Sequence, residues 1–227
     1  MVSLGFWHSV LNTAGRYCHS VPESIADSPA HPRRGRPPTT SAGELELAAL
    51  QLFTDVGYDA TTVDMIAAAA GTSRRTFFRY FDSKASVLWH AFDREVDSLR
   101  EALRAVPGDV PLLDAIRIAV VSVNHYTAAD VPELRRRINL IGTVPALQAS
   151  AAVHYDAWEQ AVIDYAAARL DQAPDALLPL ALGRATLAVC RAAYEYWVAR
   201  ADHDLTVYLD VAIRAMATGF TTASDAG

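Results

Sequence analysis

The chain has 227 residues and is 52% hydrophobic, which allows one elongated domain or two small ones with a sizeable core and excludes a disordered or repetitive chain. The formal net charge of -6 means that the average surface repels nucleic acid, so any nucleic-acid binding must use a local basic patch. Two cysteines, Cys18 and Cys190, exclude a disulfide framework and favour a reduced intracellular protein with a buried Cys190.

Residues 1–40 are predicted to form a disordered extension that ends in a basic arm. The extension has neither a basic start nor a sustained apolar block, so no secretory signal is expected, and a start codon assigned too far upstream is an alternative explanation for its first 30 residues. The segment SPAHPRRGRPPTTS contains too much proline for a regular helix. An extended basic arm suits a narrow minor groove of DNA, and its cations are Arg33, Arg34 and Arg36.

Helical periodicity begins after this arm. In residues 43–57, GELELAALQLFTDVG, the apolar residues fall on one helical face and the final glycine supplies the stop. A second helix is expected over 61–71, with Thr61 as its N-cap and Asp64 completing a capping box. A third helix follows after a Gly-Thr-Ser turn, and two short helices joined in this way have the sequence form of a helix-turn-helix, at about 62–81.

The third helix, SRRTFFRYF, has an apolar face and a basic face. Phe77 and Phe81 are four residues apart and suit a core, whereas the arginines and Phe78 fall on the other side. Arginine can donate two hydrogen bonds to a guanine in the major groove, and hydroxyl groups can donate to phosphate. The alternative is an ordinary solvated charged face. The predicted DNA contacts in and beside this motif are Thr62, Ser73, Arg74, Arg75, Thr76, Phe78, Arg79 and Tyr80.

Lys84 is the only lysine of the chain, and the sequence places it in the first turn of the next helix, behind Asp82 and Ser83 as caps. A cation there opposes the helix dipole, so its position makes sense if a DNA phosphate docks at the helix N-terminus. Lys84 is therefore added to the predicted DNA contacts.

The rest of the chain reads as helices, so the predicted fold class is all-α. Alanine is frequent, glycine is sparse within the long segments, and prolines mark the breaks. No apolar stretch reaches the roughly 18 residues that a membrane span needs, so no membrane partner is expected. The expected helices after the third one span about 84–106, 112–128, 132–141, 147–170, 176–201 and 205–220.

The stretch TTVDMIAAAAGTSRRTFFRYFDSK resembles the TetR family of bacterial transcriptional regulators. The resemblance implies a helix-turn-helix DNA-binding domain over 41–101, followed by a helical effector-binding and dimerisation domain over 102–227. More narrowly, RRTFFRYF, INLIGTVPALQAS, YDAWEQAV and AAYEYW resemble the mycofactocin-system regulator group.

Carried over by position, the resemblance implies base and backbone reading by Ser73, Arg74, Arg75 and Thr76, and phosphate contacts by Tyr80 and Lys84. Many family members have tyrosine where this chain has Phe78. A phenyl ring cannot donate to phosphate, so it is expected to contact bases or sugars instead.

The family likeness also requires an effector cavity in the second domain. Polar and aromatic residues within otherwise apolar helices are candidates to line it, although such residues are more often ordinary core. Arg135–Arg137 are expected to form a solvated face, with an anionic ligand head such as a coenzyme A phosphate as the alternative. The candidate ligand-binding residues are Asn124, His154, Trp158, Cys190, Tyr194 and Trp197.

Taken together, these patterns predict a cytoplasmic homodimeric repressor that binds an approximately palindromic operator in double-stranded DNA and is released by a small-molecule effector. A long-chain acyl-coenzyme A is one expected effector. An activator with the same DNA-binding domain is an alternative, and a helical enzyme or small-molecule carrier is the rival from another class. No catalytic residue, cofactor or metal site is predicted.

Overall fold

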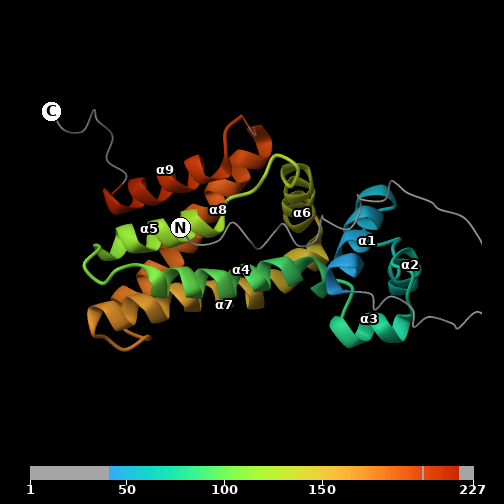
Figure 1. Cartoon of the computed structure of the whole chain (residues 1–227), viewed down its shortest axis with the longest axis horizontal. Coiled ribbons are helices and arrows are strands. Elements are labelled where there is room, and N and C mark those ends of the chain that lie inside the picture. Colours follow the sequence, from blue (N-terminus) through green and yellow to red (C-terminus); the bar gives the residue numbers. More distant parts are fainter. Residues whose placement is uncertain (1–40, 201, 220–227) are drawn as a thin grey trace, which may run out of the picture.

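The computed structural model describes residues 41–200 and 202–219, and within these ranges every regular element is an α-helix, which confirms the predicted fold class (Figure 1). The residues placed on the extension and basic arm, including Arg33, Arg34 and Arg36, lie outside the described ranges. In chain order the helices are α1 (Ala42–Asp55), α2 (Val63–Ala69), α3 (Arg74–Tyr80), α4 (Ser86–Ala105), α5 (Leu112–Val123), α6 (Val131–Thr143), α7 (Pro145–Leu170), α8 (Leu177–Arg200) and α9 (Leu205–Ala217).

The helices α1, α2 and α3 form a small head at one end of the molecule (Figure 1). Helix α1 begins with a complete capping box, in which the Ser41 hydroxyl accepts from the Glu44 amide and the Glu44 carboxylate accepts from the Ser41 amide. The core of the head contains residues of all three helices together with the start of α4 and of α7. Its fully buried side chains include Leu45, Phe53, Ile66, Phe77, Val87, Leu88 and Leu147.

The cap of α2 differs from the prediction. Thr62, not Thr61, is the N-cap, and its hydroxyl accepts from the Met65 amide at 3.2 Å. Thr61 is buried, and its hydroxyl donates to the carbonyl of Gly57 at 2.8 Å. A buried hydroxyl needs a partner, and the preceding turn supplies a carbonyl for Thr61.

The start of α4 also differs from the prediction. The helix begins at Ser86, so Lys84 precedes it and does not lie in its first turn. Ala85, not Asp82 or Ser83, is the N-cap of α4. The Ser83 hydroxyl nevertheless accepts from the Ser86 amide while the Ser83 amide donates to the Ser86 hydroxyl, both at 3.1 Å.

The helices α4, α5, α7, α8 and α9 pack around a second, larger core, and α6 lies between this body and the head (Figure 1). Helix α4 takes part in both cores. Val87 and Leu88 at its start belong to the head, whereas Val96, Leu99 and Leu103 belong to the larger body. The head is therefore joined to the body through a continuous helix, which can carry a displacement from one to the other.

Helix α8 is the one described helix that is long and apolar enough to cross a bilayer, with a mean hydropathy of 1.2 over its most apolar window. This differs from the prediction that no stretch would qualify. In the structure α8 packs against α7 and α9, and its residues Leu187, Cys190 and Trp197 lie in the larger core. Length and composition of this kind are also those of a core helix.

Candidate DNA-binding surface and effector cavity

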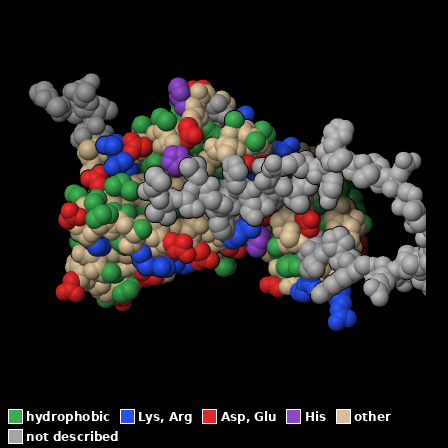
Figure 2. Space-filling model, in the orientation of Figure 1, with side chains coloured by type: hydrophobic (Ala, Val, Ile, Leu, Met, Phe, Trp, Pro, Cys, Tyr) green, Lys and Arg blue, Asp and Glu red, His purple; other side chains and the backbone are tan. Residues whose placement is uncertain are grey.

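The helix α3 presents its basic face to solvent, as its periodicity predicts. Phe77 is fully buried in the head, whereas Arg74, Arg75 and Arg79 are exposed. Figure 2 shows Lys and Arg side chains projecting from the edge of the head at which α3 lies. Ser73 caps this helix, since its hydroxyl accepts from the Thr76 amide at 3.2 Å.

Two of the three arginines on α3 have partners within the head. Arg74 donates to Asp64 of α2 at 3.0 Å, and its guanidinium lies 5.1 Å from the centre of the Phe78 ring. Arg79 lies 4.8 Å from the centre of the Tyr80 ring. Arg75 has no hydrogen-bond or ion-pair partner in the described part of the chain, so it can meet a ligand without breaking an existing contact.

The hydroxyl-bearing candidates keep their place in the head through helix caps. Thr62 and Ser73 accept backbone N–H groups at the starts of α2 and α3, and Thr76 shares a hydrogen bond of 3.1 Å with the Ser73 hydroxyl. Phe78 and Tyr80 are 43% and 37% exposed, so both rings can reach a partner. Ser73 and Thr76 lie at the start of α3, whereas Tyr80 is its last residue and Thr62 caps α2.

Lys84 is bound within the molecule. Its ammonium donates to the carbonyls of Tyr58 at 2.6 Å and Thr61 at 2.9 Å, and lies 4.0 Å from the centre of the Tyr58 ring. An ammonium has three donors, so one is left for a phosphate. The phosphate contact stays a prediction, and the structure adds that Lys84 ties the turn before α2 to the start of α4.

The larger body contains a cavity of about 710 Å³ beside the head. Its walls come from α1 and from α4 to α8, so an occupant would touch both parts of the molecule. Most of the lining is apolar, with polar groups set into it, as is usual for a small-molecule site. The apolar lining includes Leu47, Phe92, Val120, Leu134, Ile138, Ile141 and Leu187.

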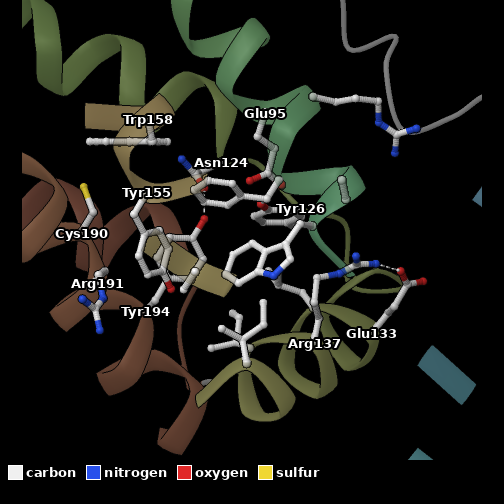
Figure 3. Close-up of a pocket in the computed structure, with 18 of the residues that line it drawn as sticks. Glu95, Asn124, Tyr126, Glu133, Arg137, Tyr155, Trp158, Cys190, Arg191 and Tyr194 are labelled. Atoms are coloured by element: carbon white, nitrogen blue, oxygen red, sulfur yellow. Dashed lines mark hydrogen bonds and ion pairs between the residues drawn. The ribbon is translucent and has the colours of Figure 1, made fainter. Parts of the chain in front are cut away.

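Four of the six candidate ligand-binding residues line this cavity, namely Asn124, Trp158, Cys190 and Tyr194 (Figure 3). His154 does not, because its ring stacks on Trp89 at 4.6 Å and pairs with Asp93 at 2.7 Å. Trp197 does not line this cavity either, since it is buried and its indole N–H donates to the carbonyl of His203 at 3.0 Å.

Polar side chains meet on one side of the cavity (Figure 3). Tyr126 donates to the Glu95 carboxylate at 2.8 Å, and Tyr194 donates to the side-chain oxygen of Asn124. The Asn124 amide in turn donates to the carbonyl of Val120 at 2.8 Å, which fixes the orientation of the side chain. These contacts join α4, the end of α5 and α8 through groups that an occupant can reach.

Burial changes the acid–base behaviour of these groups. It raises the pKa of the Glu95 carboxyl from 4.5 to about 7, and the hydrogen bond from Tyr126 offsets part of that rise. Burial also raises the pKa of Tyr126 and Tyr194 well above 10.0, so both phenols stay protonated and remain donors. Burial raises the pKa of the Cys190 thiol to about 12, so Cys190 is an apolar wall residue and not a nucleophile.

A charged cluster lies at the end of the cavity next to the head. Arg137 is only 7% exposed and donates to Glu46 of α1, to Glu133 at 2.8 Å and to the carbonyl of Leu88 at 3.2 Å. The prediction that Arg135–Arg137 form a solvated face is wrong for Arg137. It points between α6 and α1, and two carboxylates compensate its charge there.

Three further cavity residues, Glu95, Tyr126 and Glu133, were not predicted from the sequence, and Arg137 was given a ligand contact only as the alternative to a solvated face. A partial signal was present, because Glu133 and Arg137 are four residues apart on one helical face. Nothing local marks Glu95, because its hydrogen-bond partner Tyr126 lies 31 residues away, beyond the end of α5. In the part of the chain that the structure describes, no group of three or more His, Cys, Asp or Glu residues could hold a metal ion.

A helix-turn-helix with an arginine-bearing second helix, joined to an all-helical body with an internal cavity, defines a DNA-binding transcriptional regulator. Residues 47–90 match the family model of the bacterial regulatory proteins of the tetR family, and residues 110–221 match that of the MftR C-terminal domain. The chain belongs to the TetR family.

Known proteins agree with this assignment. The chain is 30% identical over 191 residues to a Mycobacterium tuberculosis protein assigned as the mycofactocin biosynthesis regulator MftR, covering 84% of this chain and 96% of that protein. It is 32% identical over 139 residues to the transcriptional activator FasR of Mycolicibacterium smegmatis, covering 58% and 62%.

Solved structures share the fold. Thermus thermophilus FadR, a TetR family repressor in complex with lauroyl-CoA, matches with a TM-score of 0.56 at 21% identity, covering 80% of this chain and 96% of FadR. The Bacillus halodurans fatty acid degradation regulator FadR matches with a TM-score of 0.58 at 18% identity, covering 82% and 98%.

Proposed function

We propose that this regulator is a cytoplasmic repressor that dissociates from its operator when a small molecule binds in the cavity. The observation that carries the proposal is the position of the cavity, whose wall includes Glu46 and Leu47 of α1 in the DNA-binding head. An occupant contacts the head directly, and a ligand shifts a conformational equilibrium only if it interacts differently with the two states.

The proposed effector is an apolar chain with an anionic or oxygen-rich head, such as a long-chain acyl-coenzyme A. The mostly apolar walls suit the chain. Arg94 lines the cavity, and its Nε is buried without a hydrogen-bond partner in the described residues, so an oxygen of the effector would satisfy it. The FadR structural neighbour with bound lauroyl-CoA supports the same class of ligand.

The proposed assembly is a homodimer formed through α8 and α9. These helices expose apolar side chains that have no cover in the single chain, among them Tyr196 at 49%, Val207 at 48% and Val211 at 61% exposure. A two-fold pair would place two copies of α3 about one DNA turn apart, so the operator would be an approximate palindrome. The domain limits 41–101 and 102–227 belong to this proposal.

The proposed targets are genes of the mycofactocin system, on the strength of the likeness to MftR over most of both chains. An activator remains the second candidate, because FasR, which matches 58% of this chain, is named as an activator. Both classes use the same DNA contacts, so they differ in the operator's place relative to the promoter and not in the head.

The test measures binding of a fluorescent DNA fragment from upstream of the mycofactocin genes. Arg75→Ala is expected to weaken binding roughly ten- to a hundredfold, because a bidentate arginine–guanine contact contributes about 1–3 kcal/mol. Arg104→Ala is the matched control, since Arg104 is an exposed arginine near the far end of α4. Equal affinity of the two variants for the fragment would contradict the proposed DNA surface.

A further inference from the structure

The contact between α6 and α1 is a buried ionic cluster. Arg137 of α6 is 7% exposed and Glu46 of α1 is 3% exposed, and they form an ion pair. Arg137 also donates to the carbonyl of Leu88 on α4 and to Glu133 on its own helix. A buried ion pair of this kind tolerates little displacement, because a charge that loses its partner keeps the full cost of its desolvation.

The Arg137–Glu46 pair differs from the other ion pairs in the helices that it joins. Of the ion pairs between described residues, Arg137–Glu46 is the one that joins the helices α1–α3 to the helices α5–α9. Other links between elements, such as Arg117–Asp210 between α5 and α9, stay within the larger body. The Arg137–Glu46 pair is therefore the ionic contact that ties α1 of the head to the cavity wall on α6.

The members of the cluster also line the cavity. Glu46, Glu133 and Arg137 all contribute to its wall, as do the apolar residues Leu134 and Ile138 of α6. Figure 3 shows Glu133 and Arg137 side by side at the cavity. An occupant that reaches this end of the cavity would contact α6 beside the cluster and can offer its own acceptor to the guanidinium. A new acceptor for Arg137 competes with Glu46, so it favours a larger distance between the two side chains.

We propose that Arg137 is the positioning residue that transmits cavity occupancy to the DNA-binding head, by holding Glu46 of α1 when the cavity is empty and releasing it when the cavity is filled. The inference deepens the proposed function and rests on it. Such an ion pair is suited to a switch, because a buried guanidinium that loses one carboxylate is strongly destabilised unless another acceptor replaces it.

The effector is unidentified, so the test fills part of the cavity with a larger side chain of the protein itself. Leu134 lies three residues before Arg137 and lines the same end of the cavity, so Leu134→Trp fills the space beside the cluster with an indole ring. The substitution is expected to lower operator affinity at least tenfold in the otherwise unchanged protein.

The same substitution is then placed in a chain that lacks both charges, Glu46→Leu with Arg137→Met. Replacing both members of a buried pair by apolar groups of similar size preserves folding better than removing one. In this background Leu134→Trp is expected to change operator affinity less than threefold. Arg117→Met with Asp210→Leu is the matched control, because it removes an ion pair of the larger body whose members do not line the cavity. In the control the tenfold loss is expected to persist.

The double-mutant comparison separates the possible failures. An equal loss in the Glu46–Arg137 background and in the control would overturn the inference, and so would an unchanged affinity after Leu134→Trp alone. Failure of the unsubstituted protein to bind the upstream DNA would instead contradict the proposed function. Thermal unfolding of every variant identifies any whose weak binding reflects loss of fold.

Discussion

Glu95 lies in the cavity wall, where its carboxylate accepts from Tyr126 and forms no ion pair with an arginine or lysine of the described residues. Burial without a cationic partner favours the protonated, neutral carboxyl group, and it raises the pKa of Glu95 to about 7. The charge of the cavity wall therefore changes near neutral pH, and the affinity for the proposed effector, if it is charged, would change with it.

We predict that Glu95→Gln makes the protein less sensitive to pH. The carboxyl pKa is raised on folding from 4.5 to about 7, so the folded state binds the proton more tightly. The resulting stabilisation is complete below pH 4.5 and is lost as the pH rises to about 7. The variant should gain stability relative to the natural chain between pH 5 and pH 8, by at most about 3 kcal/mol. Urea unfolding of both proteins at pH 5 and at pH 8 measures this difference in the free energy of unfolding.

The control for this prediction is Glu101→Gln, an exposed position on the same helix. Because the Glu101 side chain is exposed, its replacement by glutamine is expected to change the stability little. A Glu95→Gln difference that is the same at both pH values would show that the carboxyl is not shifted.

The sequence predicted the surroundings of some single residues and not of others. The exposure of Arg75 follows from the period of one short helix, so the sequence predicted it correctly. Lys84 and Arg137 could not be placed in the same way. The carbonyls that bind Lys84 lie 23 and 26 residues away, and the Glu46 partner of Arg137 lies 91 residues away. Such partners depend on tertiary packing, which no local pattern contains.

At the scale of elements, α7 and α8 cross closely at Gly183. A Cβ atom added there would lie 2.5 Å from Cγ1 of Ile163 and 3.0 Å from the carbonyl oxygen of Glu159, both on α7. The helices can approach this closely only because position 183 has no side chain. A glycine in the middle of a helix is otherwise unfavourable, so packing must offset its low helix propensity.

Gly183→Ala is expected to destabilise the fold by about 1–3 kcal/mol, because the added methyl group overpacks the interface between α7 and α8. This corresponds to a fall in Tm of roughly 2–10 °C for a chain of this size. Gly142→Ala on α6 is the matched control, since a Cβ atom there meets nothing within 4 Å. The control should be neutral or slightly stabilising, and calorimetry showing the same loss for both would refute the close crossing.

The order and type of the helices were predictable, whereas several of their ends were not. Helix α5 was expected to continue to 128, but it ends at Val123, where the Asn124 side chain bonds back to the helix. Helix α7 begins at Pro145, two residues earlier than expected, because proline fits the first turn of a helix. Periodicity identified the helices, whereas their first and last residues depend on local features such as the Asn124 contact and the position of Pro145.

At the scale of the whole molecule, the proposed dimer makes a prediction about α9. Val211→Glu places a charge on an apolar surface that is 61% exposed in the single chain. If this surface is the dimer interface, the carboxylate would be buried without a partner, and the variant should dissociate at concentrations at which the natural chain is paired. Sedimentation velocity over a dilution series measures this.

Val153→Glu on α7 is the control, because Val153 is 73% exposed on another helix. Its sedimentation is expected to match that of the natural chain. If Val211→Glu also sediments like the natural chain, α9 does not form the interface.

The two cores of the molecule explain how one chain can both bind DNA and respond to a ligand. The sequence predicted the two parts, since the helix-turn-helix motif and the helical remainder are each visible locally. It could not predict that the cavity wall includes α1, because that contact forms only when α6 packs against the head. The coupling between the parts is a property of the packed structure.

The central claim, a DNA-binding surface centred on α3, is tested most directly by titrating the protein onto its own upstream DNA at several salt concentrations. Sequence-specific binding should appear at moderate salt, and the logarithm of the affinity should fall linearly with the logarithm of salt concentration as phosphate counterions are released. Binding that is equally weak on this fragment and on unrelated DNA, at every salt concentration, would contradict the account.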